Sequence, residues 1–235
     1  MNDIIRQIRS ELQTNADEEK KVGAENYFKE AICVYGVSTA LVTKIGKAYY
    51  QKIKSLSKDE VFQLCEELWQ SGYMEEAFIA CNWSYYRHLE YTPEDFAVFE
   101  RWVESYVSNW ATCDTLCNHT VGDFLQMYPD YLPELIRWAR SDNRWMRRAA
   151  AVSLIVPAKQ GKFLDEVMGI ADILLTDGDD LVRKGYGWML KEASRCHQAE
   201  VFDYIMKNKQ TMPRTSLRYA IEKMPKELKA QAMAK

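Results

Sequence analysis

Apolar residues recur at the spacing of an α-helix along almost the whole chain, and this pattern limits the possible folds more than any other feature. One apolar stripe within residues 58–69 consists of Val61, Leu64, Cys65 and Leu68. Near residue 92 the sequence predicts a helix start, with Thr92 as the N-cap and Pro93 at the first helical position. Only ten glycines and six prolines interrupt the pattern, and no run alternates as a strand would. We therefore expect an all-α protein.

The second half of the chain repeats itself at an interval of 34–36 residues. Residues 143–154 align with residues 180–190 at an offset of 36, and residues 214–224 form a third, looser copy. A repeat of this length, with a basic residue just ahead of a small-residue helix, is typical of stacked antiparallel helix pairs. We predict a right-handed superhelix of such pairs, a HEAT-like repeat solenoid, forming a single domain over residues 1–235.

Basic residues occupy matching positions in these copies. Arg147 aligns with Arg183, Arg148 aligns with Lys184, and Arg218 follows Lys184 by 34 residues. Cationic side chains near consecutive helix starts suit phosphate groups, because helix N-termini also present backbone N–H groups. Basic residues at helix ends are also common on an ordinary solvated surface, so both interpretations stay open at this point.

The composition is that of a globular protein, with 47% apolar and 28% charged residues. No apolar run approaches the roughly 18 residues that a membrane-spanning helix needs, and the charged N-terminal segment lacks the apolar region of a signal peptide. We expect a cytoplasmic protein, a monomer without membrane contact, whose six cysteines are reduced thiols.

The net charge of −3 hides an uneven distribution. Residues 39–58 contain five lysines and no acid, whereas residues 58–105 contain three basic and eleven acidic residues. Residues 141–225 contain fourteen basic and eleven acidic residues. Because a locally basic surface can bind an anion on an acidic protein, the net charge does not exclude a nucleic-acid partner.

The stretch "SNWATCDTLCNHTVG" at 108–122 contains the most distinctive spacing. Trp110 and Asp114 are four residues apart, as are Cys113 and Cys117, so each pair shares one face if the segment is helical. It could be a metal site, an aromatic–carboxylate pair or core. Zinc sites usually combine two Cys/His knuckles, and the chain has no second knuckle, so we expect no metal and assign the cysteines to packing.

Several segments resemble the AlkD-like family of DNA alkylation repair glycosylases, whose fold is a superhelix of HEAT-like repeats. They occur in the family's order: "ENYFKEAICVYGV", "ELWQSGYMEEAFIA", "NWATCD", "DNRWMRRAA", "VRKGYGWMLKEA" and "PRTSLRYAIEKMP". The resemblance implies base excision repair of duplex DNA, in which positively charged N3- or N7-alkylated purines such as 3-methyladenine and 7-methylguanine are removed. It also implies that no metal or organic cofactor takes part.

The resemblance assigns roles residue by residue. Asp114 matches the catalytic aspartate, Trp110 and Trp188 match the aromatics that flank the lesion's deoxyribose, and Arg148 matches a contact to the DNA backbone. Tyr27 matches a further DNA contact. A fixed carboxylate stabilises the oxocarbenium ion that forms when an already cationic base departs. The other predicted DNA-binding residues, from the repeat register, are Arg147, Arg183, Lys184 and Arg218.

Near Trp188, glycines at positions 185 and 187 clear space for a neighbouring helix or for a ligand.

The sequence departs from the family at three positions: Ala111 stands where an acid is common, Ser38 where glutamine is common and Ala40 where proline is common. Two alternatives to the glycosylase therefore remain. One is a non-catalytic HEAT-like repeat module that binds distorted or branched DNA, and the other is a scaffold for a protein partner.

Overall fold

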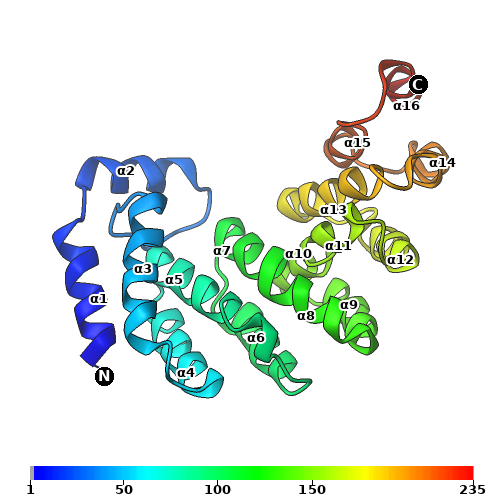
Figure 1. Ribbon diagram of the computed structural model, residues 1–235. Coiled ribbons are helices and arrows are strands. Elements are labelled where there is room, and N and C mark those ends of the chain that lie inside the picture. Colours follow the sequence, from blue (N-terminus) through cyan, green and yellow to red (C-terminus); the bar gives the residue numbers. More distant parts are fainter. Residues whose placement is uncertain (1–2, 235) are drawn as a thin grey trace. The chain divides into compact units, whose positions relative to one another are not determined.

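The computed structural model describes residues 3–234, which form helices joined by short connections (Figure 1). Within these residues there is no β-strand, and an isolated bridge joins Cys33 to Tyr73. The all-α prediction is therefore confirmed. The α-helices are α1 (Asp3–Thr14), α2 (Glu18–Tyr27), α3 (Thr39–Ile53), α4 (Lys58–Trp69), α5 (Met74–Tyr85), α6 (Asp95–Ser105), α7 (Trp110–Thr115), α8 (Gly122–Met127), α9 (Leu132–Ala139), α10 (Arg144–Val152), α11 (Ile155–Lys159), α12 (Leu164–Leu174), α13 (Asp180–Ala193), α14 (Gln198–Asn208), α15 (Arg214–Ala220) and α16 (Lys226–Met233).

The chain divides into two compact units, unit 1 (Met1–Leu116) and unit 2 (Cys117–Lys235). Each unit has its own buried core, and the two are described separately below. The single domain and the superhelix handedness stay predictions. No helix among residues 3–234 is both long enough and apolar enough to cross a membrane.

In unit 1, α3 packs against α1 and α5, and α4 packs against α5. The apolar stripe predicted for residues 58–69 is buried on α4, as expected. Trp83 ties α5 to α3, because its indole N–H donates to the Gly46 carbonyl at 2.9 Å. A Cβ at Gly46 would lie 3.3 Å from Ile79 Cγ1, so the glycine permits the close approach of the two helices.

The helix predicted to start at Pro93, with Thr92 as its N-cap, begins two residues later, at Asp95. The Asp95 carboxylate accepts the Thr92 backbone N–H at 2.7 Å and pairs with Lys58 at 2.6 Å. A carboxylate three residues after a capping residue makes this bond to the backbone N–H in a capping box, so the bond supports a helix start near Thr92. The predicted N-cap was two residues too early, because the backbone N–H groups of Asp95 and Phe96 donate to the carbonyls three residues before them, at 3.0 and 3.3 Å, and so form a tight turn before the α-helix begins.

A buried carboxylate organises the loop that follows α2. Glu75, on α5, is 3% exposed and accepts the backbone N–H groups of Tyr35, Gly36 and Val37 at 2.9–3.1 Å. Gly36 has φ +86°, and a Cβ there would lie 2.1 Å from the Asp17 carbonyl oxygen. Only glycine fits this position, so the loop has one well-defined path between α2 and α3.

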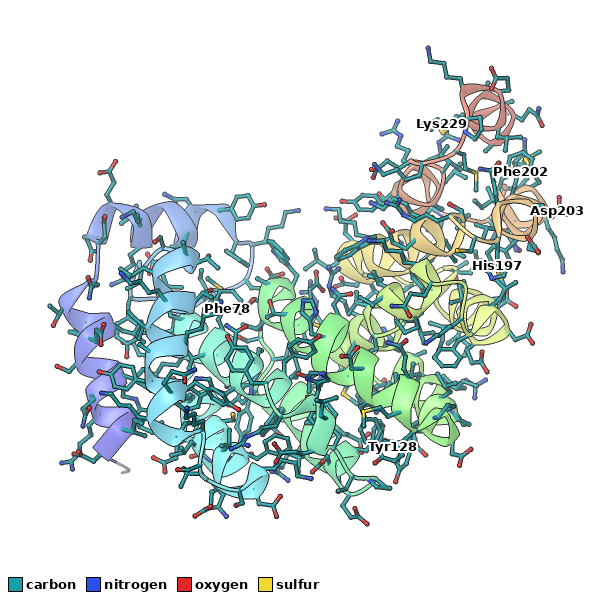
Figure 2. All side chains as sticks on the ribbon, in the orientation of Figure 1. Phe78, Tyr128, His197, Phe202, Asp203 and Lys229 are labelled. Atoms are coloured by element: carbon teal, nitrogen blue, oxygen red, sulfur yellow. The ribbon has the colours of Figure 1, made fainter. Side chains whose placement is uncertain are left out.

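In unit 2, helices pack in pairs, α9 with α10 and α12 with α13, as the 36-residue repeat predicts. The second helices of the pairs also pack in series, α10 against α13 and α13 against α15. Side chains fill the spaces between these helices, and Figure 2 labels Phe202 and Asp203 on α14 and Lys229 on α16. Unit 2 therefore has a helical repeat core.

Candidate functional site

Trp110 and Asp114 lie on α7, where the sequence predicted a helical pair. The Asn109 side chain caps the helix by accepting the Thr112 N–H at 3.0 Å. Thr112 and Cys113 are buried, whereas Trp110 and Asp114 are both half-buried. The helix therefore directs its small residues into the core and leaves the aromatic–carboxylate pair accessible, with the two residues one turn apart.

Cys113 and Cys117 are both fully buried, and neither forms a disulfide. Their predicted role in packing is confirmed by this burial. Among residues 3–234 no three His, Cys, Asp or Glu side chains are grouped in a way that could hold a metal ion.

The helix continues beyond α7 in an uncommon form. Residues Leu116–Val121 form a π-helix, and α8 follows it directly. Wider helical turns of this type are rare and occur frequently at functional sites, because they change the direction of the side chains around them. In this chain the π-helix begins at Leu116, two residues after Asp114.

Two aromatic side chains from the end of α2 lie against Trp110. The Phe28 ring is nearly parallel to the Trp110 indole, at 16° with ring centroids 5.3 Å apart. Tyr27 approaches the same indole edge-on at 6.3 Å and is 71% exposed. The structure thus brings predicted site residues Tyr27 and Trp110 together, 83 positions apart in sequence. It adds Phe28, which the sequence analysis did not single out although it directly follows Tyr27.

Arg147 and Arg183 occupy matching repeat positions in unit 2, and each donates to a carbonyl in the loop that precedes its own helix. Arg147 donates to the Ser141 carbonyl at 2.9 Å and pairs with Asp177 at 2.7 Å. At the matching position 36 residues later, Arg183 donates to the Asp177 carbonyl at 2.5 Å. The shared register of Arg147 and Arg183 therefore has a structural cause, since each arginine fixes the turn that precedes its helix.

The other predicted DNA-binding residues differ in accessibility. Arg148 is only 5% exposed, and its guanidinium donates to the Leu181 carbonyl. Lys184 pairs with Asp180 at 2.7 Å, which raises the pKa of Lys184. Arg218 is exposed. Arg148 and Lys184 thus have partners within the protein. Of these three residues, Arg218 is the one whose side chain is exposed to solvent.

Trp188 is half-buried on α13, with the Lys191 ammonium 5.9 Å from its ring centroid. The two neighbouring glycines serve packing. A Cβ at Gly187 would lie 2.8 Å from Tyr219 Cβ on α15, and one at Gly185 would lie 3.5 Å from Arg148 Cγ. Of the two explanations for these glycines, the neighbouring helix is the one that the structure supports.

Residues 8–224 match the family described as "DNA alkylation repair enzyme". This chain belongs to that family. The match covers most of both units and includes α2, α7, α10 and α13. Comparison with curated proteins gave no match.

Two solved structures share the fold. A predicted DNA alkylation repair enzyme from Enterococcus faecalis superposes with a TM-score of 0.81 at 16% identity, over 90% of this chain and 98% of that chain. The Pseudomonas fluorescens alkylpurine DNA glycosylase AlkC, bound to DNA containing an abasic site analog, superposes with a TM-score of 0.54 at 17% identity, over 97% of this chain and 64% of that chain. At these identities the likeness establishes the fold of this DNA alkylation repair family member.

Proposed function

We propose that this chain is an AlkD-like DNA glycosylase that excises positively charged N3- and N7-alkylated purines from duplex DNA. The observation that carries the proposal is the half-buried Trp110–Asp114 pair, one turn apart on α7 and backed by the rings of Tyr27 and Phe28. Membership of the repair family and the fold shared with an alkylpurine glycosylase support it.

The proposed chemistry needs few protein groups. The bond between C1′ and the base nitrogen breaks, and its electron pair leaves with the cationic base, which becomes neutral. Positive charge then develops on the sugar, where the Asp114 carboxylate stabilises it. Water adds to C1′ and loses a proton, which completes hydrolysis. Trp110 and Trp188 would place aromatic faces beside the cationic sugar, an attraction of about 0.5–2 kcal/mol for each ring.

The DNA contacts proposed for the basic residues are best tested at Arg218. This residue is exposed, whereas a charge reversal at Arg148 would bury an unpaired carboxylate and unfold the protein instead of reporting on DNA. We expect Arg218→Glu to weaken duplex binding. The slope of the logarithm of the binding constant against the logarithm of salt concentration should also decrease in magnitude by about one. Lys207→Glu, on the exposed side of α14, is the matched control and should leave binding unchanged.

The experiment that tests the activity is incubation of the wild-type protein with methylated duplex DNA, with released bases separated by chromatography. A glycosylase releases 3-methyladenine and 7-methylguanine and leaves abasic sites. A non-catalytic module would retain a distorted duplex in a binding assay without releasing either base, and that result at saturating protein would overturn the proposal.

A further inference from the structure

Unit 1 contains an open cavity of about 630 Å³ between the C-terminal parts of α3 and α5. Tyr50, Tyr85, Tyr86 and His88 contribute aromatic rings to its wall, and Lys47 also lines it. None of these residues belongs to the site on α7. A cavity of this size is in the range that holds a small organic group, and an aromatic lining suits a flat one.

The rings of this cavity are held in fixed orientations. Tyr50 and Tyr86 meet edge to face at 4.8 Å, and Tyr85 stacks on His88 at 5.0 Å and 16°. The Arg87 guanidinium lies 5.8 Å from the Tyr50 ring centroid and pairs with Glu90. Burial raises the pKa of Tyr50 and of Tyr86, so both phenols stay neutral at physiological pH. The cavity therefore presents preorganised aromatic rings, and the phenols of Tyr50 and Tyr86 among them are neutral.

A row of lysines runs past the cavity on the exposed side of α3. Lys44, Lys47 and Lys54 fall on one side of the helix, within about 80° of arc and about 15 Å of axis. In the described part of the chain none of the three forms an ion pair, whereas Lys20, Lys21 and Lys58 all pair with acids. These lysines belong to the 39–58 segment, which contains no acid at all. The surface is thus a positively charged track beside an aromatic cavity.

We propose that the α3 lysine row and the Tyr50–Tyr85–Tyr86 cavity form a binding surface for single-stranded DNA. Unpaired lysines along a track bind consecutive phosphates, and half-buried rings that line an open cavity can stack with bases. Single-stranded DNA fits better than a duplex because bases offer their faces to a protein only when they are unstacked. Such a strand arises wherever a duplex opens, including beside damaged bases, so this surface would give unit 1 a contact that does not depend on base excision.

Binding of a fluorescein-labelled oligothymidine of about 10 nucleotides, followed by fluorescence anisotropy in the full chain, tests this proposal. Lys44→Glu/Lys47→Glu should weaken binding at least tenfold and reduce its salt dependence. The control Lys207→Glu/Lys226→Glu makes the same charge change on α14 and α16 and should bind as the wild type does. Equal weakening by both double variants would overturn the assignment.

Two further measurements separate stacking from charge attraction. Tyr85→Leu should bind the oligothymidine about 5- to 150-fold more weakly, and the dependence of its binding on salt concentration should not change. An oligomer with the same phosphates but abasic sugars should bind the wild type more weakly than the oligothymidine does. Equal affinity for the two oligomers, or tighter binding to phosphatidylserine vesicles than to either, would contradict a single-stranded DNA surface. Base release from methylated duplex is a separate readout, so failure here leaves the glycosylase proposal unaffected.

Discussion

The ring of Phe28 lies nearly parallel to the indole of Trp110, with the two ring centroids 5.3 Å apart. One face of the indole is therefore covered by the Phe28 ring, which restricts the orientation of the indole. Phe28 directly follows the last residue of α2, and the loop beyond it is anchored through Glu75. The orientation of Trp110 thus depends on contacts with segments far away in the sequence.

Replacing Phe28 should show whether this stack positions Trp110. We expect Phe28→Leu to lose about 0.5–1.5 kcal/mol of folding stability from the aromatic pair and to lower the single-turnover rate of base release while duplex affinity is kept. Phe28→Tyr preserves the ring and should restore the rate. Phe202→Leu, a half-buried phenylalanine on α14, serves as the control. An unchanged rate in folded Phe28→Leu would contradict a positioning role.

The two glycines of α13 should respond oppositely to alanine. A Cβ at Gly187 would meet Tyr219 Cβ at 2.8 Å and the Ser216 carbonyl at 2.9 Å, so Gly187→Ala should cost about 1–3 kcal/mol. At Gly185 the new methyl group would make ordinary contacts at 3.5 Å, and the better helix propensity should stabilise the fold by about 0.5–1 kcal/mol. Urea unfolding of both variants measures the difference, and equal effects would contradict this packing.

The Glu66 carboxylate links stability to pH. Burial raises its pKa, but hydrogen bonds from Arg101, Tyr106 and Trp102 outweigh burial, so the pKa of Glu66 is lowered overall. A lowered folded-state pKa stabilises the fold at pH values above the unfolded pKa, and this contribution disappears as pH falls through the folded value. We expect the stability difference between wild type and Glu66→Gln to shrink between about pH 6 and about pH 3.

Chemical unfolding across this pH range provides the measurement. Glu25→Gln, on the exposed side of α2, is the control, because it removes a carboxylate without such hydrogen bonds and should change stability little at any pH. A Glu66→Gln difference that grows toward acid pH would show that the sign of the shift is wrong.

Apolar periodicity was enough to predict the all-α fold, since the stripe on α4 faces the core as its spacing requires. The helix start near Thr92 was predicted two residues too early, because backbone hydrogen bonds between residues three apart form a turn there, and the cap residues alone do not specify that turn. The 36-residue repeat predicted the helix pairs of unit 2. It did not reveal that Arg147 and Arg183 fold back onto their own loops.

For the candidate site, helical spacing placed Trp110 and Asp114 on one accessible face, and the family resemblance selected Tyr27. The sequence gives no direct signal for Phe28, because a phenylalanine after a helix end is common and its partner lies more than 80 residues away. The accessibility of Arg148 was also beyond sequence reasoning, since its burial depends on the approach of α13 at Gly185.

The most direct test of the proposed glycosylase compares Asp114→Asn with the wild type in single-turnover release of 7-methylguanine from methylated duplex DNA. Asp123→Asn is the matched control, because Asp123 is also half-buried and lies on α8, further along the same run of helix. We predict that Asp114→Asn loses about 100-fold or more in rate while duplex binding is kept, and that Asp123→Asn retains the wild-type rate. Equal release by wild type and Asp114→Asn would contradict the assignment of Asp114 as the catalytic carboxylate.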